Sequence, residues 1–282
     1  MAIITFDGAT AEIFEFRSKT NAREYHVMIH AKRSLDTFQE QYMALRMAAM
    51  LIQKKHLNNA QPVMKRYFVS DATNQALFIK ERGAVSIIQQ PPLDGTKVAL
   101  WMLLLSDIEI TVGNNITEYD WDGFHHLWIS NMHHQGEDSH EQALSIFHGY
   151  VDELKNHRCT LAGNCIRTWL YINDVDNRYK GMVRARNEVF AQEGLTEHFI
   201  ASTGVAGRQA EQGRQESPEV LPERRDYLTL HRVFTSRHKK PPKTGIFISF
   251  KVPSHYASRS NARRNIDNPV SLSRRDNPES VH

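Results

Sequence analysis

One pattern of strand and turn residues occurs twice in the chain, about a hundred positions apart, and this repeat limits the fold more than any other feature. The segments VMKRYFVSDATN (63–74) and IRTWLYINDVDN (166–177) align without a gap at an offset of 103. Each is a β-branched and aromatic run that ends in turn residues, which is typical of a strand. The positions that coincide include Asp71/Asp174 and Asn74/Asn177. The sequence therefore predicts one folding unit used twice.

A helix is expected before each of these strands, because apolar residues recur there every three or four positions. Asp36 is a suitable N-cap for the first helix, and Asp138 with Ser139 starts the second, where Glu141 stands in a capping-box position. The pairs Glu40-Gln41 and Glu141-Gln142 lie 101 positions apart. The apolar stripes are Phe38, Tyr42, Leu45, Ala49 and Ile52 in the first helix and Leu144, Phe147, Val151 and Leu154 in the second.

Further strand patterns complete a β-β-α-β-(α)-β-β unit in each half. Two strands precede the first helix, AEIFEF and EYHVMIH, and two precede the second, IEITV and HHLWIS, on either side of NNITEYDWDG. The strands that follow are AVSIIQQ and KVALWMLLL in the first copy and HFIASTGVAG in the second. A second helix is expected at 179–193, whereas the first copy has lost or shortened its counterpart.

Composition changes sharply near residue 206. Residues 206–282 hold 15 of the 35 Lys and Arg, 8 of the 32 Asp and Glu, and 7 of the 10 prolines. A polar, Pro- and Arg-rich segment favours partial disorder. The expected organisation is therefore a degenerate unit at 1–106, a second unit at 107–230, and a basic, poorly ordered tail at 231–282.

The second copy (125–207) resembles the Rid (YjgF-like) family. The matching features, in order, are the strand end at Ile129-Ser130, a long helix, a strand ending in Asn173-Asp174, a second helix, and Ser202-Thr203-Gly204-Val205. Two tandem units with a degenerate first copy are similar to the chorismatases, fused relatives of this family. The resemblance implies an α+β fold of two Rid- or chorismate-mutase-like units. Each would have a six-stranded sheet with helices packed on one face, and the units would assemble as a trimer or pseudo-trimer.

The resemblance also implies a binding cleft between units, in which Rid proteins hydrolyse enamines and imines. Ser130 and Thr203 are then expected to contact the ligand, and Asp226 to position the attacking water. The family's arginine immediately precedes the Ser-Thr dipeptide, but Ala201 stands there in this sequence, so that guanidinium is missing. Arg208 is a candidate substitute. The alternatives are an ordinary strand-end serine, a packed threonine and a solvated aspartate.

Other chemistries find little support in the sequence. Arg167 lies within a strand and points to the face opposite Ile166, where a structural salt link is expected rather than substrate binding. The adjacent histidine pairs put neighbouring side chains on opposite faces, so no metal site is expected. The motifs GxGxxG, GxxxxGK[ST] and GxSxG are absent, and no cofactor is expected. The histidines considered are His125, His126, His133, His134 and His140.

Partners and location follow from what the chain lacks. No apolar run is long enough for a membrane span, and the N-terminus lacks a secretion pattern, so a cytoplasmic protein with reduced Cys159 and Cys165 is expected. The basic tail could bind phosphates, but without aromatic interleaving a nucleic-acid partner is not favoured. A truncated or frame-shifted end would also explain the tail.

Two functions remain open from the sequence. One is a protein that binds a small carbonyl or carboxylate metabolite and hydrolyses an enamine, an imine or a chorismate-like enol ether. The other is a catalytically inactive ligand-binding or regulatory protein of the YjgF translation-inhibitor type.

Overall fold

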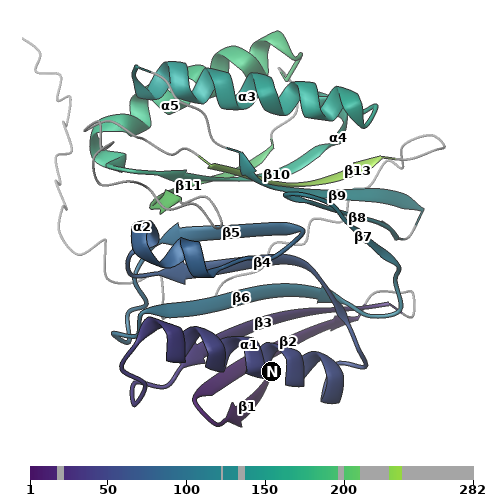
Figure 1. Cartoon of the computed structure of the whole chain (residues 1–282). Helices are drawn as coiled ribbons and strands as arrows, with labels where there is room; N and C mark the ends of the chain where they lie inside the picture. The colour runs from purple at the N-terminus through teal and green to yellow at the C-terminus, as the bar shows by residue number, and fades with distance from the viewer. Residues whose placement is uncertain (18–21, 122, 133–136, 196–199, 210–228, 237–282) are drawn as a thin grey trace, which may run out of the picture. The chain divides into compact units, whose positions relative to one another are not determined.

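The computed structural model describes residues 1–17, 22–121, 123–132, 137–195, 200–209 and 229–236 (Figure 1). All of these residues belong to one unit, Met1–Pro241. GIFISFKV and most of the expected tail lie outside the described residues. No helix within the described ranges is long and apolar enough to cross a membrane.

The first copy forms one sheet and its helix. Three antiparallel strands come first, then a long helix, a strand, a short helical turn and two more strands. In chain order these are β1 (Ala2–Phe6), β2 (Ala9–Arg17), β3 (Arg23–Ala31), α1 (Phe38–Lys55), β4 (Gln61–Val69), α2 (Ala72–Gln75), the 3₁₀ turn η1 (Ala76–Phe78), β5 (Ala84–Gln89) and β6 (Val98–Leu105).

The second copy has the same order of elements with a full second helix. Its elements are β7 (Ile110–Val112), β8 (Ile116–Trp121), β9 (Phe124–Met132), α3 (Ser139–Asn156), the short α4 (Leu161–Asn164), β10 (Cys165–Ile172), α5 (Val175–Gln192), β11 (Ala201–Ala206), β12 (Arg208–Gln209) and β13 (Thr229–Ser236). The last strand crosses the boundary expected at residue 230, so the second unit extends at least to Ser236.

The two sheets have the same topology. The first has the strand order β1-β2-β3-β6-β4-β5, with β12 added at its edge, and the second has β7-β8-β9-β13-β10-β11. In both, the repeated strand is parallel to one neighbour and antiparallel to the other. Both repeated strands also carry an irregularity at the same place, between Pro62 and Met64 in β4 and between Cys165 and Arg167 in β10. The offset of 103 is therefore an equivalence in register, and an α+β fold of two tandem units is observed.

The turns after the repeated strands also correspond. Asn74 Nδ2 donates to Asp71 Oδ2 at 2.6 Å, and Asn177 Nδ2 donates to Asp174 Oδ2 at 2.9 Å. Asp71 and Asp174 are the N-cap residues of α2 and α5. The coincident residues thus make the same side-chain hydrogen bond in each copy, although Asp71 is extended and Asp174 is left-handed, with φ of 50°. Asp and Asn commonly form such contacts after a strand.

Two expectations from the sequence are corrected at the level of elements. Thr37, rather than Asp36, caps α1. Its hydroxyl accepts a hydrogen bond from the Glu40 amide, and the Glu40 carboxylate accepts one from the Thr37 amide. The segment NNITEYDWDG is no simple connection, because it contains β8. With β1, this gives each copy three strands before its long helix instead of two.

Helices cover only one face of each sheet (Figure 1). α1 packs on the first sheet, where Tyr42 and Leu45 join a core with Val27 and Leu100. α3 and α5 pack on the second, where Phe147 and Phe190 approach to 5.8 Å between ring centroids. The other faces of the two sheets meet in a third apolar cluster. Its buried members are Val63, Met64, Ala84, Leu103, Leu105, Tyr119 and Trp128.

The contact between α3 and α5 depends on a glycine. A Cβ added at Gly181 would lie 3.0 Å from the backbone nitrogen of His140, closer than real Cβ atoms normally approach. We expect Gly181→Val to lower the free energy of unfolding by about 1–3 kcal/mol, the usual cost of overpacking. Chemical denaturation monitored by circular dichroism measures this change. Lys180→Val at the exposed neighbour is the control, with a cost of only about 0.5 kcal/mol from helix propensity. Equal stability of the two variants would contradict the close helix contact.

Candidate functional site

A buried arginine stands in the layer between the two sheets. Arg66 lies on β4, where strand alternation points it away from the α1 face, and it is only 3% exposed. Its guanidinium carbon lies 4.9 Å from the ring centre of Trp101, 5.1 Å from Trp169 and 5.3 Å from Tyr171. Trp101 belongs to the first sheet, and the other two rings come from β10 of the second. Aromatic side chains of both copies therefore surround one cation.

The charge of Arg66 is not neutralised by the described residues. Its Nε and Nη2 atoms are buried without a hydrogen-bond partner, and no described carboxylate forms an ion pair with it. Burial lowers the pKa of Arg66, and the Tyr171 phenol partly offsets this effect. The layer does hold a buried carboxylate, Glu24, but its oxygen pairs with His26 Nε2 at 2.8 Å. A buried charge without a counter-charge is costly, so this position favours an anion.

A second arginine extends the cluster toward solvent. The guanidinium of Arg167 lies 4.8 Å from the centre of the Trp169 ring, and its Nη2 donates to Thr203 Oγ1 at 3.2 Å. Burial lowers its pKa too, although the side chain is only partly buried. The salt link expected for Arg167 is not present among the described residues. Instead, its side chain joins the inter-sheet layer. In the β10–β11 register Arg167 pairs with Ala201, the position at which the resemblance led us to look for an arginine.

Only one of the four site residues expected from the sequence lies in this arginine–aromatic cluster. Thr203 is there, as the acceptor for Arg167. Ser130 is 1% exposed on β9, three strand positions away from β11, and its hydroxyl donates to the Asn115 carbonyl at 3.3 Å. Arg208 lies on β12 at the edge of the first sheet and donates to Thr73 Oγ1 at 3.2 Å. Asp226 lies outside the described residues.

Arg66 was missed by the sequence analysis, although a signal for it exists. At the offset of 103, Arg66 corresponds to Trp169, so a charged residue replaces an aromatic one on a strand with buried positions on both faces. A charge at such a position indicates either a buried ion pair or a ligand contact.

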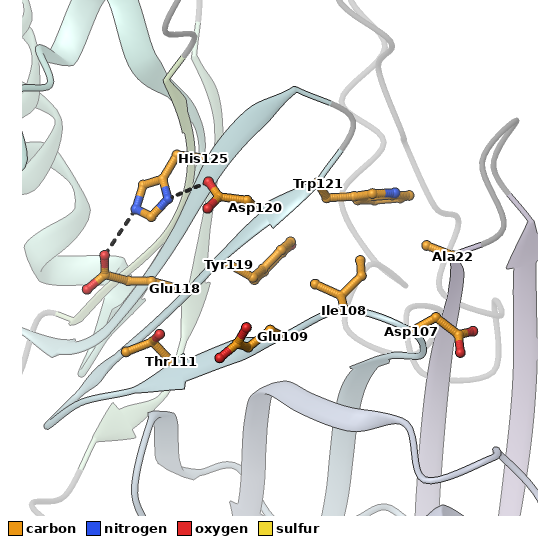
Figure 2. A pocket seen from close by; sticks show the side chains of 10 residues that line it. All are labelled: Ala22, Asp107, Ile108, Glu109, Thr111, Glu118, Tyr119, Asp120, Trp121 and His125. Atoms are coloured by element: carbon orange, nitrogen blue, oxygen red, sulfur yellow. Dashed lines mark hydrogen bonds and ion pairs between the residues drawn. The ribbon is translucent and has the colours of Figure 1, made fainter.

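A separate cleft of about 670 Å³ opens near the edge of the second sheet (Figure 2). Four carboxylates line it, and the His125 ring lies between two of them, 3.0 Å from Glu118 and 2.9 Å from Asp120. Its negative charge is opposite to that of the arginine–aromatic cluster and does not suit an anionic ligand. The carboxylates are Asp107, Glu109, Glu118 and Asp120.

The histidines do not gather into a metal site in the part of the chain that the structure describes. No group of three or more potential ligands was found there. His125 and His126 point to opposite faces of β9, His140 pairs with Glu188 at 3.0 Å, and His133 and His134 lie outside the described residues.

The chain was compared with known proteins, and no family model and no curated protein matches it significantly. Among solved structures it is similar to a chorismatase, with 12% identity and a TM-score of 0.48 over 83% of this chain and 79% of that one. It is also similar to NMB1025, a YjgF family member from Neisseria meningitidis, with 17% identity and a TM-score of 0.32 over 47% and 98%. It is similar as well to Rv2704, a YjgF/YER057c/UK114 family member from Mycobacterium tuberculosis. The identity is 12% and the TM-score 0.30, over 42% of this chain and 84% of that one. The structural neighbours thus include the two groups named by the sequence resemblance.

The inter-sheet layer also contains a partly buried, neutral histidine. His126 stacks on Tyr119 with 4.7 Å between ring centres, and its Nδ1 is buried without a partner among the described residues. Burial lowers the pKa of His126 to about 4, although a backbone hydrogen bond with Trp121 opposes the shift.

This histidine predicts a loss of stability in acid. In the unfolded chain His126 gains a proton as the pH falls through 6.5, but in the folded protein only near pH 4. The contribution of neutral His126 to the free energy of unfolding is therefore fully present above pH 6.5. It decreases as the pH falls toward 4, by about 3 kcal/mol in total. We expect His126→Phe to flatten this part of the curve of unfolding free energy against pH. His148→Phe, which replaces an exposed histidine on α3, is the control. An unchanged slope in His126→Phe would show that another group causes the acid sensitivity.

Proposed function

We propose that this protein binds a small carbonyl or carboxylate metabolite between its two sheets, with Arg66 and Arg167 supplying the positive charge. The observation that carries the proposal is the pair of guanidinium groups without a described counter-ion. Arginine presents a planar fork of donors that suits a carboxylate, and the unpartnered Nε and Nη2 of Arg66 would gain hydrogen bonds from such a ligand.

Access favours Arg167 as the first contact. Arg167 and Thr203 are partly buried, and Ala201 beside them is exposed, so this side of the cluster is open to a ligand. Adjacent strands lie about 4.8 Å apart. An arginine on β10 could therefore do the work that the Rid resemblance assigns to the strand position held here by Ala201.

Hydrolysis of an enamine, an imine or a chorismate-like enol ether is the proposed reaction. The ligand carboxylate would be held by the arginines, and Asp226 is the proposed residue for orienting water. The alternative is a catalytically inactive ligand-binding or regulatory protein, favoured by the aromatic rings packed closely around Arg66. A cytoplasmic location and self-association as a trimer or pseudo-trimer belong to the same proposal and rest on the resemblance.

Turnover distinguishes these functions. The protein is incubated with 2-aminoacrylate generated in situ, and separately with chorismate. Ammonia and pyruvate are followed in the first reaction, and pyruvate in the second. We expect pyruvate to form faster than in the uncatalysed reaction with one of the two substrates. In Arg167→Met we expect this rate to fall at least about 100-fold, which is typical of losing a charged contact. Arg186→Met, which removes an arginine lying over Phe190 on α5, is the matched control. Binding of pyruvate or chorismate without turnover would favour the regulatory alternative.

Removing the Arg66 charge should stabilise the protein while it abolishes binding. Methionine has a similar length and no charge, and replacing buried ionic groups by apolar ones raises stability by about 1–4 kcal/mol in known cases. We expect Arg66→Met to raise the free energy of unfolding without ligand, measured by urea denaturation, and to lose the carboxylate binding measured by calorimetry. Arg186→Met should change stability by less than about 0.5 kcal/mol. A strongly destabilised Arg66→Met would mean that the guanidinium is already compensated within the chain, which argues against an anion site.

A further inference from the structure

Helix α1 exposes a stripe of methionine side chains. Met43, Met47 and Met50 are 56%, 52% and 52% exposed, respectively. Their spacing of four and three residues puts them on one face of the helix. Three large apolar side chains in one row on the surface indicate a contact surface rather than scattered exposure.

The second copy shows what normally covers this face. At the helix offset of 101, Met43 and Met50 correspond to Leu144 and Val151 of α3, which pack into the apolar core of the second copy, whereas Met47 corresponds to the exposed His148. α3 lies against the 18-residue α5 there, through contacts such as that between Phe147 and Phe190.

The first copy has no such helix. Between β4 and β5 it has only α2 and η1, and the last residue of η1, Phe78, is itself 42% exposed beside Phe38. Met43 and Met50 thus lie on the part of α1 that has no covering helix, and Met47 lies beside them on the exposed side.

The ends of α1 carry opposite charges. Asp36 and Glu40 lie at its N-terminus, and Lys54 and Lys55 form its last turn. A second α1 packed antiparallel would bring each acidic end against a basic end and would oppose the two helix dipoles. The midpoint of the helix lies between Arg46 and Met47, so a two-fold axis there would place Met43 against Met50 of the second copy.

We propose that the methionine face of α1 binds the same face of a second copy of this chain, with the two helices antiparallel. One patch is then used by both subunits, as two-fold symmetry requires. Methionine side chains suit such a contact because they are flexible enough to interdigitate without a fixed shape.

The mass of the full chain in solution tests this proposal. Sedimentation velocity over a range of concentrations should show a species whose mass is halved by Met47→Glu, because the axis brings two carboxylates together. Met47 is exposed, so the variant should keep the circular dichroism spectrum of the unchanged protein, and its thermal unfolding at concentrations where both are monomeric. The control is Leu93→Glu, which adds the same charge at a 70% exposed apolar residue elsewhere. A chain that is monomeric at all concentrations, or an unchanged mass in Met47→Glu, would overturn the proposal.

A charge exchange tests the antiparallel arrangement. Lys54→Glu and Asp36→Lys should each raise the dimer dissociation constant roughly tenfold, because the symmetry repeats each change. The double variant should return to within about threefold of the unchanged protein. If the double variant instead shows the sum of the two losses of binding free energy, residues 54 and 36 of different subunits do not lie close together. The antiparallel arrangement is then wrong.

Discussion

Each sheet in this protein has two faces to cover and helices on only one of them. The second face can be removed from water only by the other sheet, and the apolar cluster between the sheets is built from both copies. This requirement explains why the unit occurs twice, and it creates a layer in which residues far apart in the chain become neighbours. Arg66 and Trp169 occupy equivalent positions in the two copies, and they meet in this layer with 5.1 Å between guanidinium and ring.

The layer combines features that pull stability and function in different directions. Stacked and edge-on rings, such as Trp128 and Trp169 at 6.3 Å, contribute apolar area and favourable ring geometry. The guanidinium of Arg66 and the neutral imidazole of His126 add polar atoms that lack partners among the described residues. Proteins retain such costly groups mainly where a ligand or a switch uses them. The arginine–aromatic cluster is therefore where the search for a ligand should begin.

The repeat, the long helices and the α+β class could be predicted from the sequence because periodicity and turn chemistry are local. Asp71 and Asn74 have the same spacing as Asp174 and Asn177, and each pair forms the same side-chain hydrogen bond after its strand. Strand β1 was missed because it has only five residues and lies directly before the longer run of β2, and β8 because polar residues interrupt its apolar ones. The site was harder, since it depends on which faces of two sheets come together. Thr203 was expected to contact a ligand, and it accepts a hydrogen bond from Arg167 of the neighbouring strand, while Arg208 lies elsewhere, on β12.

The position of the last strand in each copy has a consequence for the order of assembly during synthesis. β6 lies between β3 and β4, and β13 lies between β9 and β10, so each sheet receives an interior strand last. A growing chain can close the first sheet once residue 105 is available, whereas the second stays divided until Thr229–Ser236 has been made. During that interval the finished first half presents an uncovered apolar face to the cell. A nascent chain of this kind has its greatest need of a chaperone late in translation, after most of its residues have already been joined.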